Sequence, residues 1–227
     1  MSPQSDLYLS PVSDLNILVM AKTERNKEQT KQKLIDAVGT IIVRDGFNAI
    51  GINTISKEAG LDKVLIYRYF DGLDGLLHAF AKQKDFYINI SKEIYEQIEK
   101  ASKENVKQLI VQVLNNQLRE LRTNKELQEL MLWEMIERNE LTIAIAKERE
   151  EKGYELSEKL KEKMNIPDAE LDTDAIMSIL VSGLYYLALR SRTVNIFNGV
   201  QIDSKEGWLR IESAVQTIVD SLFNILK

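Results

Sequence analysis

The sequence predicts an all-α protein, and three observations support that prediction. Only three prolines and ten glycines interrupt its 227 residues. Long stretches are rich in Lys, Glu, Leu and Ile, and their apolar residues recur three or four positions apart, as they do on one face of a helix. No run of alternating β-branched residues persists for the length of a strand. We expect about nine helices in two domains, because the chain exceeds the usual domain size of roughly 100 to 200 residues.

Residues 1–20 show no helical period and contain Pro3 and Pro11. They also lack the charged region and the small-residue cleavage site of a signal peptide. We expect a disordered extension. The string AKTERNKEQTKQKL after Met20 is typical of the start of a small cytosolic protein and favours translation from Met20.

The first domain is expected over residues 21–72, and its first helix runs from about Asn26 to Arg44. Asp45-Gly46 ends that helix, because glycine can take the left-handed conformation that closes a helix. A second helix should run from Ile50 or Gly51 to Ala59. The apolar positions that define these two helices are Leu34, Ile35, Val38, Ile41, Ile42, Ile52, Ile55 and Ala59.

Gly60 ends the second helix, and Asp62 is placed to cap a third, short helix over Lys63 to Tyr69. Aspartate favours a helix start because its carboxylate accepts hydrogen bonds from the free backbone amides there. Two short helices joined by a glycine turn form a helix-turn-helix.

The second domain is expected over residues 73–227. One long helix should cover Gly72 to about Ala101, where apolar residues lie mostly three or four apart. The charge-dense segment 147–164 is interpreted as a solvated helix face. The further helices are expected at about 103–122, 125–138, 140–164, 173–197 and 205–226.

Composition excludes several classes of function. The chain has no cysteine and one histidine, so disulfides, thiolate metal sites and zinc clusters are not expected. It contains no phosphate-binding loop, GxGxxG, GxSxG or HExxH motif, so we expect no enzyme and no cofactor. The longest apolar run, 175–189, is shorter than the roughly 20 residues of a membrane span and is interpreted as a buried helix in a cytosolic protein.

The net charge of −5 argues against non-specific binding to nucleic acid. Between Ala21 and Lys82, however, ten Lys or Arg stand against eight Asp or Glu. The basic surplus is therefore local and coincides with the helix-turn-helix.

The second helix of a helix-turn-helix can enter a DNA major groove, which is about 12 Å wide, with its N-terminal residues at the base edges. Four residues of the third helix should then face DNA: Lys63, Val64, Tyr67 and Arg68. Lys22, Arg25 and Lys27 are expected to meet phosphates.

The string over residues 46–70 resembles the TetR family of bacterial transcriptional regulators, and the resemblance covers roughly residues 26–80. The family pattern is a glycine-aromatic pair, then hydrophobic-x-x-Ile-Ala-x-x-Ala-Gly-Val, then Tyr-x-Tyr-Phe. The matching residues are Gly46-Phe47, Ile52, Ile55-Ser56, Ala59-Gly60-Leu61 and Tyr67-Arg68-Tyr69-Phe70.

Five positions depart from the pattern. Ile50-Gly51 replace a threonine pair, Asp62 replaces a serine cap, and Val64 replaces a glycine inside the third helix. Leu73 replaces the lysine that usually grips a phosphate at the start of helix four, so one family contact with DNA is missing.

Carried over by position, the family roles place Tyr67 on a backbone phosphate and Thr54 within reach of one. Tyr69 is expected in the core. The residues implied to contact bases or phosphates are Asn53, Lys63, Val64 and Arg68.

A helix-turn-helix covers one half-site, so a two-fold homodimer is expected to engage a palindromic site. The last two helices offer small and apolar residues for its interface, with an intrachain core as the alternative. The expected interface residues are Ile179, Ser182, Gly183, Tyr186, Trp208, Ile211, Val215, Ile218, Val219 and Leu222.

The resemblance further implies a small-molecule ligand in the second domain, which shifts the helix supporting the DNA-binding pair and releases DNA. The function that follows is a dimeric regulator of transcription, most often a repressor. The alternative is a helical adaptor whose helix-turn-helix contacts protein. Residues expected at the ligand pocket, or else simply in the core, are Phe86, Ile90, Leu114, Trp133, Met135, Met177 and Tyr185.

Overall fold

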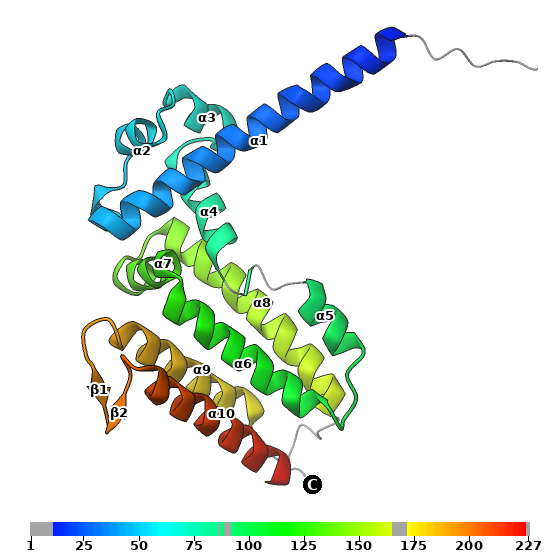
Figure 1. Ribbon diagram of the computed structural model, residues 1–227, viewed down its shortest axis with the longest axis vertical. Coiled ribbons are helices and arrows are strands. Elements are labelled where there is room, and N and C mark those ends of the chain that lie inside the picture. Colours follow the sequence, from blue (N-terminus) through cyan, green and yellow to red (C-terminus); the bar gives the residue numbers. More distant parts are fainter. Residues whose placement is uncertain (1–10, 86, 89–91, 165–171, 226–227) are drawn as a thin grey trace, which may run out of the picture. The chain divides into compact units, whose positions relative to one another are not determined.

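The computed structural model describes residues 11–85, 87–88, 92–164 and 172–225 (Figure 1). The chain divides into two compact units, Met1–Ala79 and Phe80–Lys227. Helix α4 (Leu73–Lys84) begins in the first unit and ends in the second.

The first unit begins with a long helix, α1 (Pro11–Asp45), followed by a single 3₁₀ turn, η1 (Phe47–Ala49). The expected start near Asn26 is wrong, and residues 11–20, expected to be disordered, lie in the helix. Pro11 occupies the first helical position, where its missing N–H would have no helical acceptor anyway, and no proline or glycine follows before Gly39. The end of α1 is as predicted, since Gly46 has φ 79°.

Helices α2 (Ile52–Ala59) and α3 (Val64–Phe70) complete the helix-turn-helix. Ile55 of α2 and Ile66 of α3 are fully buried, together with side chains of α1 and α4. Arg44, near the end of α1, forms an ion pair of 3.0 Å with Glu58 of α2. The other buried apolar residues of this unit are Leu34, Ile35, Ala37, Val38, Ile41, Ile42, Leu76 and Leu77.

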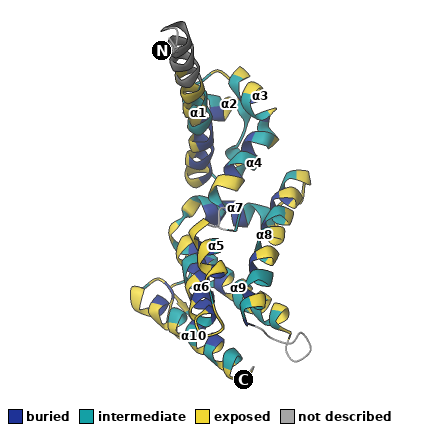
Figure 2. Ribbon diagram, turned by 90° about the vertical axis from the view of Figure 1, so that its right-hand side faces the viewer, coloured by how far each residue is buried: buried dark blue, intermediate teal, exposed yellow. Residues whose placement is uncertain are grey.

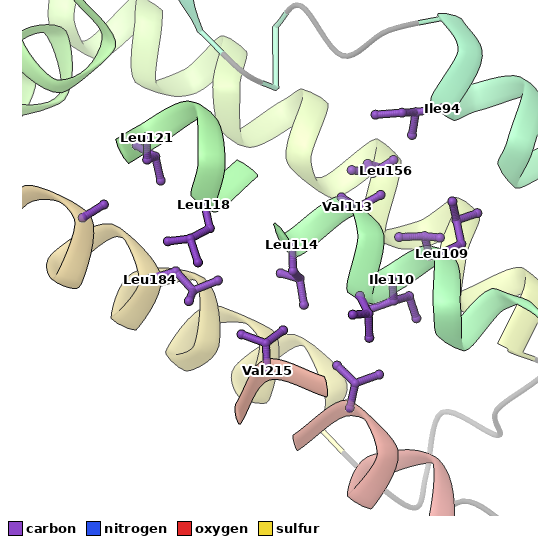
Figure 3. Close-up of a cluster of buried hydrophobic side chains, with 14 of the residues drawn as sticks. Ile94, Leu109, Ile110, Val113, Leu114, Leu118, Leu121, Leu156, Leu184 and Val215 are labelled. Atoms are coloured by element: carbon purple, nitrogen blue, oxygen red, sulfur yellow. The ribbon is translucent and has the colours of Figure 1, made fainter. Parts of the chain in front are cut away.

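The second unit is built around α6 (Val106–Thr123), which packs against five other helices (Figure 1). Figure 3 shows side chains of α6, among them Leu114 and Leu118, meeting Leu156, Leu184 and Val215 from three of these neighbours. The surrounding helices are α5 (Lys92–Glu99), α7 (Lys125–Ile136), α8 (Glu140–Met164), α9 (Thr173–Arg190) and α10 (Lys205–Ile225).

The expected single helix over residues 72–101 is wrong, because α4 ends at Lys84. Asp85 Oδ1 accepts hydrogen bonds from the backbone amides of Tyr87 (2.9 Å) and Ile88 (3.2 Å). A carboxylate that binds the next amides in this way competes with the helical pattern and turns the chain.

The expected helix over 173–197 is also shorter, and a β-hairpin follows it. Strands β1 (Ile196–Phe197) and β2 (Val200–Gln201) pair antiparallel around Asn198 (φ 45°) and Gly199 (φ 75°). Asn-Gly favours this two-residue turn, because both central residues need positive φ. The all-α class is confirmed, and this hairpin is the only sheet in the described ranges. None of the described helices is long and apolar enough to cross a membrane.

Candidate nucleic-acid interface and ligand cavity

The turn between α2 and α3 has the geometry that the glycine predicts. Gly60 takes the left-handed conformation (φ 65°), and the Leu61 amide donates to the Ser56 carbonyl oxygen at 3.0 Å. This bond closes α2 and redirects the chain. A residue with a side chain would be strained at position 60.

Asp62 organises the start of α3. Its Oδ1 accepts a hydrogen bond from the Val64 amide at 2.9 Å, and its carbonyl accepts one from the Leu65 amide at 3.0 Å. The carboxylate thus satisfies an amide that the helix leaves free and complements the positive end of the helix dipole.

One face of α3 is open to solvent while the opposite face is buried. Val64 is 53% exposed and Tyr67 is 56% exposed, whereas Ile66 is 0% exposed. Lys63 and Arg68 are also exposed, and among the described residues neither side chain has an ion-pair partner. Lys63 and Tyr67 are four positions apart, and so are Val64 and Arg68, so these residues lie on the same side of the helix. Together with its N-cap Lys63, α3 presents two cations and a phenol on one surface. Tyr69, expected in the core, is half-buried, and the predicted Asn53 and Thr54 are exposed on α2.

The three cations expected to meet phosphates all lie within α1, including Lys22 and Arg25, which precede the expected helix start near Asn26. Lys22 and Arg25 are exposed. Lys27 forms an ion pair of 3.1 Å with Glu24, and hydrogen bonding and attraction to that carboxylate raise the pKa of Lys27. Lys22 and Arg25 therefore remain the better candidates for phosphate contact.

A half-open cavity of about 620 Å³ lies in the second unit, between side chains of α6, α8 and α9. Of the seven residues predicted for a ligand pocket, Leu114, Met177 and Tyr185 line it. Trp133 is half-buried and Met135 is 63% exposed at the end of α7, and neither residue lines this cavity. Phe86 and Ile90 lie outside the described residues.

One wall of the cavity carries a buried charge cluster that the sequence analysis missed. Arg149 of α8 is only 5% exposed. Its Nε donates to Asp85 Oδ2, and its Nη1 donates to Glu134 Oε1 at 2.7 Å. Burial opposes the charge of Arg149, but the two carboxylates outweigh burial and raise its pKa. The interpretation of 147–164 as a solvated face is therefore wrong at Arg149.

Two tyrosines that line the cavity, Tyr87 and Tyr185, are connected by hydrogen bonds through Gln117, which is fully buried. The Tyr87 hydroxyl donates to Gln117 Oε1 at 3.0 Å, and Gln117 Nε2 donates to the Tyr185 hydroxyl oxygen at 2.8 Å. Burial raises the pKa of Tyr87 to about 12 and that of Tyr185 further. Both phenols stay protonated at neutral pH.

Comparison with known proteins agrees with the geometry of the first unit. Residues 31–80 match the family model of bacterial regulatory proteins of the tetR family. The matched residues contain the end of α1, the whole helix-turn-helix and most of α4. An 82-residue stretch is 37% identical to the HTH-type transcriptional regulator BetI of Vibrio campbellii (strain ATCC BAA-1116). That match spans only about a third of the length of the relative, 36%, and 36% of this chain.

Solved structures are similar over nearly the whole fold. The fatty acid degradation regulator FadR from Bacillus halodurans is 21% identical, with a TM-score of 0.63 over 84% of this chain and 94% of that chain. A TetR family transcription regulator from Marinobacter aquaeolei VT8 is 15% identical, with a TM-score of 0.54 over 87% of this chain and 97% of that one. At sequence identities this low, the similarity shows a shared fold alone.

The first unit also contains a close approach that could not be predicted from the sequence alone. A Cβ built on Gly75 of α4 would stand 1.8 Å from the carbonyl oxygen of Phe70, the last residue of α3. Only glycine allows α4 to start this close to α3. The Gly-Leu-Asp-Gly string at 72–75 was the available signal. Leu73, where the TetR family usually has lysine, is half-buried.

The predicted dimer interface divides into two groups. On α9, Ile179 is 73% exposed and Tyr186 is 51% exposed, with Ser182 and Gly183 exposed between them, so α9 is not the buried helix expected from its apolar run (Figure 2). On α10, Ile218 is 41% exposed, and Ile211 and Leu222 are half-buried.

Trp208, Val215 and Val219 are at most 4% exposed and belong to the core of the second unit, so their assignment to an interface is wrong. Arg122 of α6 lies over the Trp208 ring, 4.3 Å from its centroid. The apolar stripe of α10 is too wide to be covered by a single neighbouring helix. Its buried part packs against other helices of the same chain.

Proposed function

We propose that this protein is a homodimeric regulator of transcription that binds a palindromic DNA operator and is released by a small molecule, acting most simply as a cytoplasmic repressor. The observation that carries the proposal is the exposed face of α3. Lys63, Val64, Tyr67 and Arg68 are open to solvent, while Ile66 on the other side is fully buried. A helix anchored by one side and presenting cations on the other suits a major groove.

A dimer is needed to read two half-sites. Its support is one face of α9, where Ile179, Ser182, Gly183 and Tyr186 follow helical spacing and are exposed. No heavy atom lies within 4 Å of a Cβ built on Gly183. A second helix can therefore approach α9 closely at this position, with Ile218 of α10 extending the contact.

Release by a ligand requires that cavity and recognition helix be coupled, and α4 supplies a continuous connection. Its first turn holds Gly75 against Phe70 of α3. Directly after its last residue, Asp85 is bound by Arg149, which lines the cavity. A ligand that prefers one position of Arg149 would bias α4, and a preference of about 1 to 3 kcal/mol is typical of such coupling.

Selection of genomic fragments with the purified full-length protein tests the proposal. Enrichment of a palindromic sequence, with an affinity that falls steeply as salt rises, is expected because Lys and Arg displace counterions from phosphates. Failure to enrich any palindrome would contradict it. If the protein bound no DNA but associated with another protein, and that association persisted at high salt, the adaptor alternative would be favoured.

A further inference from the structure

Two residues that line the cavity of the second unit, Arg149 and Tyr185, each carry a hydrogen-bond donor that lacks an acceptor among the described residues. Arg149 uses Nε for Asp85 and Nη1 for Glu134, while its buried Nη2 has no hydrogen-bond partner among the described residues. Leaving a buried donor unsatisfied costs about 1 to 3 kcal/mol. An oxygen atom of a bound molecule would satisfy it.

Tyr185 presents the second donor. Because its oxygen accepts from Gln117 Nε2, the phenol hydrogen is left to donate, and the described residues offer it no acceptor. The Tyr87 hydroxyl donates to Gln117 Oε1, which leaves Gln117 Nε2 to donate to Tyr185. The donor and acceptor at each step of this row of hydrogen bonds are therefore defined. Tyr87, Arg149 and Tyr185 all line the same cavity.

The charges around these donors disfavour an anion. Asp85 and Glu134 place two negative charges against the single positive charge of Arg149. Glu150 also lines the cavity, while the lining Asp174 is paired with Lys161 at 2.6 Å. A ligand carboxylate would add a further negative charge. A ligand ammonium would place its N–H donors against Arg149 Nη2 and the Tyr185 hydroxyl, and the buried acceptor that lacks a partner, Glu134 Oε2, belongs to a residue that does not line the cavity.

The rest of the cavity favours an apolar tail. Val113, Leu114 and Val181 line it, and a volume of about 620 Å³ lies within the usual range for small-molecule sites. A narrow apolar pocket of about 50 Å³ shares four lining residues with it: Ile110, Ser157, Leu160 and Met177. The apolar wall therefore continues away from the donors toward Val219 and Phe223.

We propose that the cavity binds an uncharged, elongated amphiphile whose terminal carbonyl oxygen accepts hydrogen bonds from Arg149 Nη2 and the Tyr185 hydroxyl, and whose hydrocarbon chain lies along α6 and α9. The inference rests on the proposed function, because it names the ligand class of the same regulatory site. It is tested without DNA.

The experiment measures binding of three probes of equal chain length to the full-length protein at pH 8 by calorimetry: methyl decanoate, decanoate and decylamine. At this pH the acid is ionised and the amine protonated. We expect the ester to bind at least tenfold more tightly than either charged probe. Tighter binding of decanoate or of decylamine would overturn the inference, as would the absence of binding by the ester.

Tyr185→Phe removes one donor at nearly constant shape. It should weaken ester binding about fivefold, the size expected for one neutral hydrogen bond. The matched control is Tyr95→Phe on α5, since Tyr95 does not line the cavity. Unchanged ester binding by folded Tyr185→Phe would overturn the assignment of this donor.

DNA binding is measured separately on the wild-type protein without probe. If the operator binds and no ester does, the ligand class is wrong and the DNA proposal stands. If the ester binds and no operator is found, the ligand class is supported and the DNA proposal fails.

Discussion

Gly75 lies against the backbone carbonyl of Phe70 so closely that a Cβ at position 75 would stand 1.8 Å from the oxygen. Phe70 ends the recognition helix α3, and Gly75 lies in the first turn of α4. The absence of a side chain at position 75 therefore allows the first turn of α4 to lie directly against the end of α3.

Gly75→Ala should destabilise the protein by about 1 to 3 kcal/mol, because backbone, which cannot rotate away, must move to admit the methyl group. Thermal unfolding followed by circular dichroism measures the loss, and operator affinity should fall with it. Gly153→Ala in α8 is the control, since its Cβ would meet Tyr87 at an ordinary 3.9 Å. Equal stabilities of the two variants would contradict the close approach.

Leu73→Lys should strengthen DNA binding. It restores a cation at the start of α4, where the TetR pattern usually has one and where Leu73 is half-buried. One added phosphate contact should steepen the slope of log affinity against log salt by about 1. The slope is obtained from fluorescence anisotropy at several salt concentrations, with Leu73→Gln as the uncharged control. An unchanged slope would show that position 73 does not reach a phosphate.

Asp85→Ala should destabilise the second unit by about 3 to 5 kcal/mol. It leaves the buried Arg149 with one carboxylate and two backbone amides without their acceptor. Urea denaturation followed by tryptophan fluorescence is suitable, because both tryptophans lie in this unit. Glu148→Ala, which breaks the more exposed pair with Lys82, should cost less than about 1 kcal/mol.

Ile218→Glu should shift the proposed dimer toward monomer, because it places a charge at an exposed apolar position of α10 that the proposal assigns to the interface. Leu209→Glu is the matched control: Leu209 is 54% exposed on the same helix but on its opposite side. Sedimentation velocity distinguishes the two variants. A dimer that tolerates both would place the interface elsewhere, and loss of the dimer in both would point to a general effect of charge.

The helix-turn-helix could be predicted from sequence because its determinants are local. Gly60 has the left-handed conformation, Asp62 binds the Val64 amide, and Ile55 is buried as its spacing predicts. Each depends on residues a few positions away.

Prediction from the sequence failed where contacts between residues far apart in the chain determine the structure. Arg149 sits in a segment dense in charge, and only the fold brings Asp85 and Glu134 to it. Trp208 and Ile218 share one apolar stripe, yet the first is covered by the chain's own helices and the second is not. The Asn198-Gly199 turn was a local signal, and we missed it because helical spacing carried through the preceding residues.

Titration of the enriched operator with wild-type protein, Arg68→Ala and Lys57→Ala by fluorescence anisotropy tests the central claim most directly. Arg68 lies on the exposed face of α3, whereas Lys57 lies near the end of α2. The account predicts that Arg68→Ala weakens binding by about 1 to 3 kcal/mol and relaxes base preference, while Lys57→Ala stays near wild type. Unchanged binding by Arg68→Ala would contradict a reading role for this face.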